Sequence, residues 1–136
     1  MILNQPNRYA EVSRIKQKVL VIDDEKDICN LLSSILTGLG YETRTSNSLA
    51  EGKLKFISYE PNVLFLDIHL PDGNGLDDVP SFRNLNPKIQ VMIISAYDST
   101  AEMKKAKKYE VNAFIRKPFN REQVVTALND IHLMQS

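Results

Sequence analysis

Apolar and polar positions alternate along this chain in a repeating unit that begins at Lys18. In each unit a short apolar run is followed by a loop, and then by apolar residues spaced three or four positions apart. The runs predict strands that are buried on both faces, and the spaced residues predict helices that cover them. The predicted strands are residues 19–22, 41–45, 63–67, 89–95 and 111–116.

Helical periodicity follows each predicted strand. Gly40 is placed to end the first helix, and Ser48 with Glu51 forms a capping box that opens the second. Asn120 is the expected N-cap of the last helix, and Pro80 is expected near the first turn of the third helix or at a kink in it. The predicted helices are residues 27–39, 48–58, 75–85, 100–109 and 120–132.

The helical spacing also predicts which residues face the core. The expected buried residues are Ala50, Leu54 and Ile57 on the second helix, Met103 and Ala106 on the fourth, and Val124, Val125, Leu128 and Ile131 on the fifth.

Strands that alternate with helices must run parallel, because each helix carries the chain back across the sheet. The right-handed crossover rule then favours a doubly wound α/β fold, a three-layer sandwich with five parallel strands in the flavodoxin-like order 2-1-3-4-5. We assign residues 18–136 to this domain and residues 1–17 to an N-terminal leader. Tyr9, Val12 and Ile15 leave two alternatives open for the leader: a flexible segment, or a short helix docked on the domain.

Composition narrows the class of protein. The chain has 136 residues, of which 43% are hydrophobic, and its 17 basic residues balance 17 acidic ones, so nothing points to nucleic acid or a membrane as a partner. No apolar run is long enough to span a bilayer, and the N-terminus lacks a signal-peptide pattern. The single Cys29 cannot form an internal disulfide. We therefore expect a cytoplasmic protein.

Polar side chains follow four of the predicted strands at their carboxyl ends, the edge where open α/β sheets bind ligands. Three carboxylates gathered there repel one another by roughly 3 kcal/mol per pair at about 5 Å, so a divalent cation is needed. Oxygen ligands favour Mg²⁺ or Mn²⁺ over zinc. Such a site accepts a phosphoryl group, with a carboxylate as nucleophile. The residues concerned are Asp23, Asp24, Asp67, Ser95 and Lys117.

Four motifs at these strand ends resemble the receiver domain of two-component response regulators, the CheY-like superfamily. They are Val-Leu-Val-Ile-Asp-Asp-Glu at 19–25, Leu-Phe-Leu-Asp-Ile-His-Leu-Pro-Asp-Gly-Asn-Gly at 64–75, Ile-Ile-Ser-Ala at 93–96 and Ala-Phe-Ile-Arg-Lys-Pro-Phe at 113–119. The resemblance covers about residues 18–133.

The resemblance assigns a role to each site residue. It implies that Asp67 is the phosphoacceptor, that Ser95 is a switch hydroxyl, and that Lys117 contacts the phosphoryl group. The implied metal ligands are Asp23, Asp24, Asp67 and the backbone carbonyl of His69. Phe114 falls on the aromatic switch position, where tyrosine is commoner, and Ser95 stands where threonine is often found. A cis peptide bond between Lys117 and Pro118 is also expected.

The function expected from this resemblance is that of a phospho-accepting signalling module rather than an enzyme. Its implied partners are a histidine kinase or phosphotransfer protein and a downstream protein, or a second copy, bound through residues 100–133. The fourth predicted helix, which belongs to this surface, is basic because it carries four lysines. Runs of charge on a helix often form only a solvated face, however. Two alternatives remain: a pseudo-receiver that binds partners without phosphorylation, and an aspartyl-phosphate hydrolase, which adjacent Asp23 and Asp24 disfavour.

Overall fold

The structure, a computed structural model, describes residues 17–97 and 99–135, with side chains up to Asp130. The predictions for the leader, apart from Gln17, lie outside these residues. The elements are β1 (Lys18–Ile22), α2 (Lys26–Gly38), β2 (Glu42–Ser46), α3 (Leu49–Tyr59), β3 (Val63–Asp67), β4 (His69–Leu70), β5 (Gly73–Asn74), α4 (Gly75–Leu85), β6 (Gln90–Ser95), α5 (Thr100–Lys108), β7 (Ala113–Arg116) and α6 (Arg121–Gln135).

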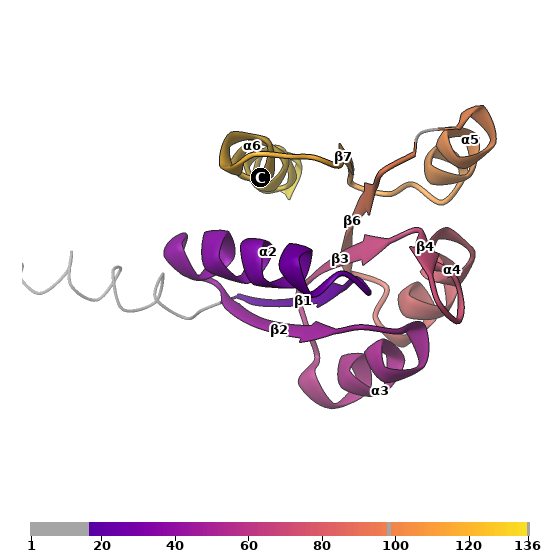
Figure 1. Cartoon of the computed structure of the whole chain (residues 1–136), viewed down its shortest axis with the longest axis horizontal. Helices are drawn as coiled ribbons and strands as arrows, with labels where there is room; N and C mark the ends of the chain where they lie inside the picture. Colours follow the sequence, from indigo (N-terminus) through magenta and orange to yellow (C-terminus); the bar gives the residue numbers. More distant parts are fainter. Residues whose placement is uncertain (1–16, 98, 136) are drawn as a thin grey trace, which may run out of the picture.

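The predicted fold is confirmed. Five strands form one parallel sheet in the order β2-β1-β3-β6-β7, which is the flavodoxin-like order once the small β4–β5 hairpin is set aside. Helices α2 and α6 cover one face of the sheet, and α3, α4 and α5 cover the other (Figure 1). The hairpin directly after β3 is not predicted by the hydrophobic pattern; in it His69 pairs with Asn74 and Leu70 with Gly73.

The three central strands supply side chains to both cores. In β1, Leu20 and Ile22 point toward α3 and α4, whereas Val19 and Val21 point toward α2 and α6. The same alternation runs through β3 and β6, because successive side chains of a strand lie on opposite faces. Continuous apolar runs are therefore required there, and the carboxyl ends of these strands become rigid supports for the polar residues that follow.

The predicted buried face of α3 is wrong. Leu54 and Ile57 are 71% and 58% exposed, and Ala50 is exposed as well. The helix is rotated by about one residue because it approaches the sheet at Gly52, where an added Cβ would lie 2.3 Å from Ile22 Cδ1. The residues that face the core are Leu49, Gly52, Phe56 and Tyr59.

Smaller corrections concern the remaining helices. Met103 is exposed, so Ala106 alone forms the buried contact of α5. Pro80 lies inside α4, beyond its first turn, and the helix continues to Leu85. On α6, Val124 and Leu128 are buried as predicted, whereas Val125 is half-buried; the side chain of Ile131 lies outside the described residues.

Candidate functional site

Four acidic side chains meet at the carboxyl edge of the sheet. Asp23 follows β1 and Asp67 ends β3, and these strands are hydrogen-bonded neighbours, so both carboxyl groups reach the same point. Asp23 is 0% and Asp67 is 4% exposed, whereas Asp24 and Glu25 face solvent. One carboxylate oxygen from each of the four lies within 4.8 Å of the others. The predicted clustering of Asp23, Asp24 and Asp67 is thus observed, with Glu25 as an addition.

Lys117 neutralises part of this cluster. Its ammonium nitrogen lies 2.8 Å from Asp23 Oδ2, 3.0 Å from Glu25 Oε1 and 3.2 Å from Asp67 Oδ2. The lysine follows β7, its backbone N–H donates to the Ser95 carbonyl at 2.8 Å, and the bond to Pro118 is cis as predicted. The side chain is therefore directed back across the sheet edge toward β1 and β3.

Ser95 and Phe114 lie beside this cluster. Ser95 ends β6, one residue beyond the Ile94 that pairs with Asp67, and its fully buried hydroxyl accepts a hydrogen bond from the Tyr97 N–H at 3.1 Å. Phe114 lies in β7 opposite Ile93 and is half-buried. Its side chain lines a groove beside α5, together with Met103 and Ala106. Ser95 thus belongs to the site edge and Phe114 to the surface next to it.

The loop after Asp67 is fixed by contacts at both sides. His69 Nε2 lies 3.0 Å from Glu102 Oε2 on α5, and the His69 ring packs edge-on against Tyr97 with ring centroids 5.3 Å apart. On the other side, Asp72 accepts the backbone N–H groups of Leu49 and Ala50 at 2.8 and 2.9 Å. The loop therefore connects the N-terminal ends of α3 and α5.

Gly75 brings the start of α4 against the site. Its N–H donates to the Ile68 carbonyl at 2.8 Å, and a Cβ at this position would lie 2.1 Å from the Asp67 carbonyl oxygen. The Asn74 side chain caps α4 by accepting from the Leu76 N–H at 2.9 Å. The close approach requires glycine and holds the backbone of Asp67 in place.

Burial and like charge act on the acids of this site. Burial, followed by the charge of Asp23, raises the pKa of Asp67 from 3.8 to about 6, although Lys117 opposes the shift. Burial raises the pKa of Asp23 as well. Burial opposes ionisation of Lys117, but its close contacts with Asp23 and Glu25 and the charge of Asp67 outweigh this and raise its pKa above the ordinary value. The site therefore holds charge that the fold alone does not fully compensate.

This shift predicts a pH dependence of stability. Because the folded-state pKa of Asp67 lies above the unfolded value, the folded protein binds a proton that the unfolded chain releases, so the stabilisation is complete below about pH 4 and is lost as the pH rises through about 6. Without divalent cations, we expect the free energy of unfolding to fall by about 3 kcal/mol across this range, as measured by urea unfolding. The Asp67→Asn variant should show a smaller fall; an equal fall in both proteins would contradict the assignment.

The donor set fits a divalent cation. Four carboxylates and one ammonium group leave a net charge of −3, and every candidate ligand is a hard oxygen, as Mg²⁺ and Mn²⁺ prefer. Asp23 Oδ2, although close to the lysine, is a buried oxygen without a well-aligned hydrogen bond. The chemistry of these residues is therefore that of a cation site.

Three contacts of the site are not predicted by the sequence pattern. Glu25 stood in the acidic run 23–25, so its type was visible, but nothing indicated that it reaches Lys117. The capping of α3 by Asp72 and the pairing of His69 with Glu102 join segments far apart in the sequence, and no local pattern signals them.

None of the helices in the described part of the chain is long and apolar enough to cross a membrane.

A parallel doubly wound sheet with acids and a lysine gathered at its carboxyl edge defines the class of protein: a doubly wound α/β domain with a cluster of carboxylates that suits a divalent cation. Comparison with known proteins identifies the family: the model of the family described as "Response regulator receiver domain" matches residues 19–129. The chain belongs to this family of two-component signalling domains, as the resemblance implied.

Relatives and solved structures agree with this assignment. The chain is 30% identical over 116 residues to chemotaxis protein CheY of Thermotoga maritima, covering 85% of this chain and 97% of the relative. It is 37% identical to the response regulator protein PilR of Pseudomonas aeruginosa over 83% of this chain, but it spans only 26% of that protein. A response regulator from Clostridium difficile has the same fold, with a TM-score of 0.82, 24% identity, and coverage of 89% of this chain and 100% of the other.

A further solved structure with a similar fold is that of a modified protein. A response regulator from Burkholderia pseudomallei, described as carrying a phosphorylated aspartic acid and a calcium ion, matches with a TM-score of 0.75 and 26% identity. The match covers 88% of this chain and 72% of the other. The relatives therefore include both domains of this chain's size and longer regulators.

Proposed function

We propose that this domain accepts a phosphoryl group on Asp67 and passes the signal to a protein partner. The observation that carries the proposal is the buried Asp67 carboxylate held 3.2 Å from the Lys117 ammonium and beside the acids of the β1–α2 loop. A phosphorylated aspartate in the Burkholderia structure supports it. The donor is a histidine kinase or a phosphotransfer protein, and the domain extends over residues 18–136.

In the proposed step, a carboxylate oxygen of Asp67 attacks the phosphorus atom, and the bond from phosphorus to the donor nitrogen or oxygen breaks. The electron pair of that bond leaves with the donor. Lys117 stabilises the negative charge on the phosphoryl oxygens, and the buried Ser95 hydroxyl is placed one residue beyond the pairing partner of Asp67 to donate to one of them. Asp23, Asp24, Asp67 and the His69 carbonyl would hold a divalent cation, and that cation would compensate further negative charge.

The test is modification by a small phosphodonor. The protein is incubated with Mg²⁺ and acetyl phosphate, and intact-mass analysis should show one added phosphoryl group. Only a single addition is expected, with no sustained release of phosphate from phosphate esters, because the domain is a signalling module rather than a hydrolase. An unmodified protein would contradict the proposal and favour a phosphorylation-independent interaction module.

The free thiol of the buried Cys29 supports a cytoplasmic location.

Cation binding is expected to depend on Asp23 and Asp24. Replacing either with asparagine removes one negative charge and one oxygen ligand, so the affinity for Mn²⁺ should fall about tenfold or more. Isothermal titration calorimetry measures the effect. Asp27→Asn, in the first turn of α2 and outside the cluster, is the matched control. An unchanged affinity in the double variant Asp23→Asn/Asp24→Asn would place the cation elsewhere.

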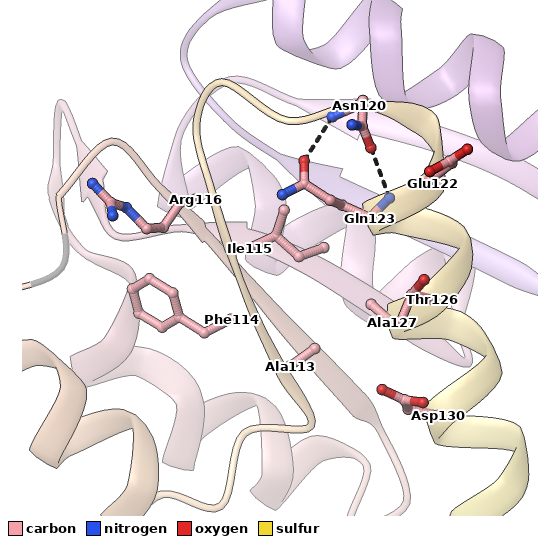
Figure 2. Close-up of a pocket in the computed structure, with 10 residues that line it drawn as sticks. All are labelled: Ala113, Phe114, Ile115, Arg116, Asn120, Glu122, Gln123, Thr126, Ala127 and Asp130. Carbon is pink, nitrogen blue, oxygen red and sulfur yellow. Dashed lines mark hydrogen bonds between the residues drawn. The ribbon is translucent and has the colours of Figure 1, made fainter.

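The proposed output surface consists of α5, β7 and α6. An open groove of about 670 Å³ lies between β7 and α6, and its lining includes Phe114, Arg116, Glu122 and Asp130 (Figure 2). Lysines of α5 border a second groove, of about 440 Å³, which Phe114 also lines. The basic helix α5 is complementary in charge to a downstream protein with acidic groups, or to the acidic side of α6 from a second copy.

Phosphorylation should alter this surface. If Ser95 moves toward the phosphoryl group, the loop that leads to α5 must follow, since Ser95 Oγ accepts the Tyr97 N–H, and Phe114 gains space to turn inward. Amide exchange of the free and beryllofluoride-bound proteins should therefore differ mainly between Ser95 and Phe119. Differences restricted to the loop after Asp67 would show that the switch is absent.

A further inference from the structure

Glu25 occupies the N-cap position of α2 but does not cap that helix. Its backbone is extended, with φ −84° and ψ 110°, and its side chain forms no capping hydrogen bond. The side chains of Ser48, Asn74 and Ser99, by contrast, each accept a hydrogen bond from their own helix. The Glu25 carboxylate instead lies 3.0 Å from the Lys117 ammonium group, 92 residues away. Its position is thus explained by the site rather than by the helix.

The carboxylate of Glu25 changes the charge of the site. With Asp23, Asp24 and Asp67 ionised, Lys117 leaves a net charge of −2, and Glu25 makes it −3. One divalent cation then leaves −1 rather than zero. A small phosphodonor such as acetyl phosphate carries two negative charges at neutral pH, so it meets net repulsion instead of a neutral site.

Glu25 also contacts the ammonium group of Lys117, which the transferred phosphoryl group requires. Lys117 contacts Glu25 and Asp67 at nearly equal distances, and the proposed step needs its ammonium group on the phosphoryl oxygens. The Glu25 side chain is 58% exposed, whereas that of Lys117 is 9% exposed. Glu25 is therefore free to turn into solvent once a phosphoryl group replaces it, while the lysine stays in place.

We propose that Glu25 is a positioning residue whose negative charge strengthens cation binding and slows the reaction of the site with small anionic phosphodonors. This inference rests on the proposed function of Asp67. It assigns Glu25 an electrostatic role: the charge favours the divalent cation, disfavours the dianionic donor, and competes for Lys117 until transfer occurs. A protein donor that brings its own cationic groups beside the phosphoryl group is less affected, which favours that donor over small molecules.

The experiment compares wild type with Glu25→Gln, Glu25→Asp and the remote control Glu42→Gln at the start of β2. For Glu25→Gln, the affinity for Mn²⁺ by calorimetry should fall about three- to tenfold, because one charge near the cation is lost. At saturating Mg²⁺, its initial rate of modification by acetyl phosphate, followed by intact mass, should rise about three- to tenfold. Glu25→Asp keeps the charge and should stay within about twofold of wild type in both measurements, as should Glu42→Gln.

Opposite shifts in affinity and rate are the signature of the charge, since a structural defect would lower both. If either quantity is unchanged in Glu25→Gln, or if its rate falls, the inference is overturned. The same holds if Glu25→Asp behaves like Glu25→Gln. A wild-type protein that acetyl phosphate leaves unmodified contradicts the proposed function itself, whereas a modified wild type with an unaltered Glu25→Gln variant contradicts only the role of Glu25.

Discussion

The Asp67→Asn variant is expected to take up no phosphoryl group under conditions in which the wild-type protein is fully modified. Asparagine keeps the size of the side chain but replaces the charged carboxylate with an amide, which is a far weaker nucleophile. Intact-mass analysis after incubation with Mg²⁺ and acetyl phosphate measures the effect. Asp130→Asn, an exposed acid of α6 outside the acidic cluster, is the control and should be modified like wild type.

Loss of folding does not account for this expected result. Burial and the charge of Asp23 make the ionised Asp67 costly in the folded state, so the neutral amide should raise the free energy of unfolding at pH 7 in the absence of metal. A variant that is at least as stable as wild type yet unmodified identifies Asp67 as the acceptor. A modified Asp67→Asn protein would place the phosphoryl group on another residue.

The Gly75→Ala variant is expected to lose about 3 kcal/mol of unfolding free energy, the upper end of the range for overpacking. The new Cβ would lie 2.1 Å from the Asp67 carbonyl oxygen and 3.0 Å from Leu66 Cγ. Both neighbours belong to the buried end of β3, so neither is able to yield without moving the strand. Urea unfolding monitored by circular dichroism measures the loss.

Gly38→Ala is the matched control for this substitution. Gly38 is the last residue of α2, and an added Cβ meets nothing within 4 Å. Alanine favours the helix, so this variant should be up to about 1 kcal/mol more stable than wild type. A Gly75→Ala protein within about 0.5 kcal/mol of wild type would show that the start of α4 adjusts without cost.

The central strands were predictable because the fold leaves them no choice of residue type. β1, β3 and β6 are covered on both faces, and only continuous apolar runs satisfy that environment. The edge strand β2 was placed one residue early because its sequence, Glu-Thr-Arg-Thr-Ser, carries no apolar run. The predicted face of α3 is wrong because the helix packs closely against the sheet at Gly52, and glycine has no side chain that would contribute to an apolar pattern.

The clustering of the site residues could be predicted from the strand ends, but the contacts between their side chains could not. Parallel strands bring their carboxyl ends to one edge, so the clustering of Asp23, Asp67 and Lys117 could be predicted from topology alone. The contacts of Glu25 with Lys117 and of His69 with Glu102 depend on side-chain directions that arise only after the helices pack.

Helix α5 is attached to the domain in an unusual way. It buries only Ala106, whereas α2 and α3 each bury three or more residues. Two further links of α5 are polar and partly exposed: Lys105 pairs with Asp77 at 2.8 Å, and Glu102 with His69 at 3.0 Å. Dissolved ions weaken exposed pairs of this kind but leave apolar contacts intact. We therefore expect the ionic strength of the surroundings to act mainly on the helix that presents the proposed output surface, and so to shift the resting position of the proposed switch independently of any phosphorylation.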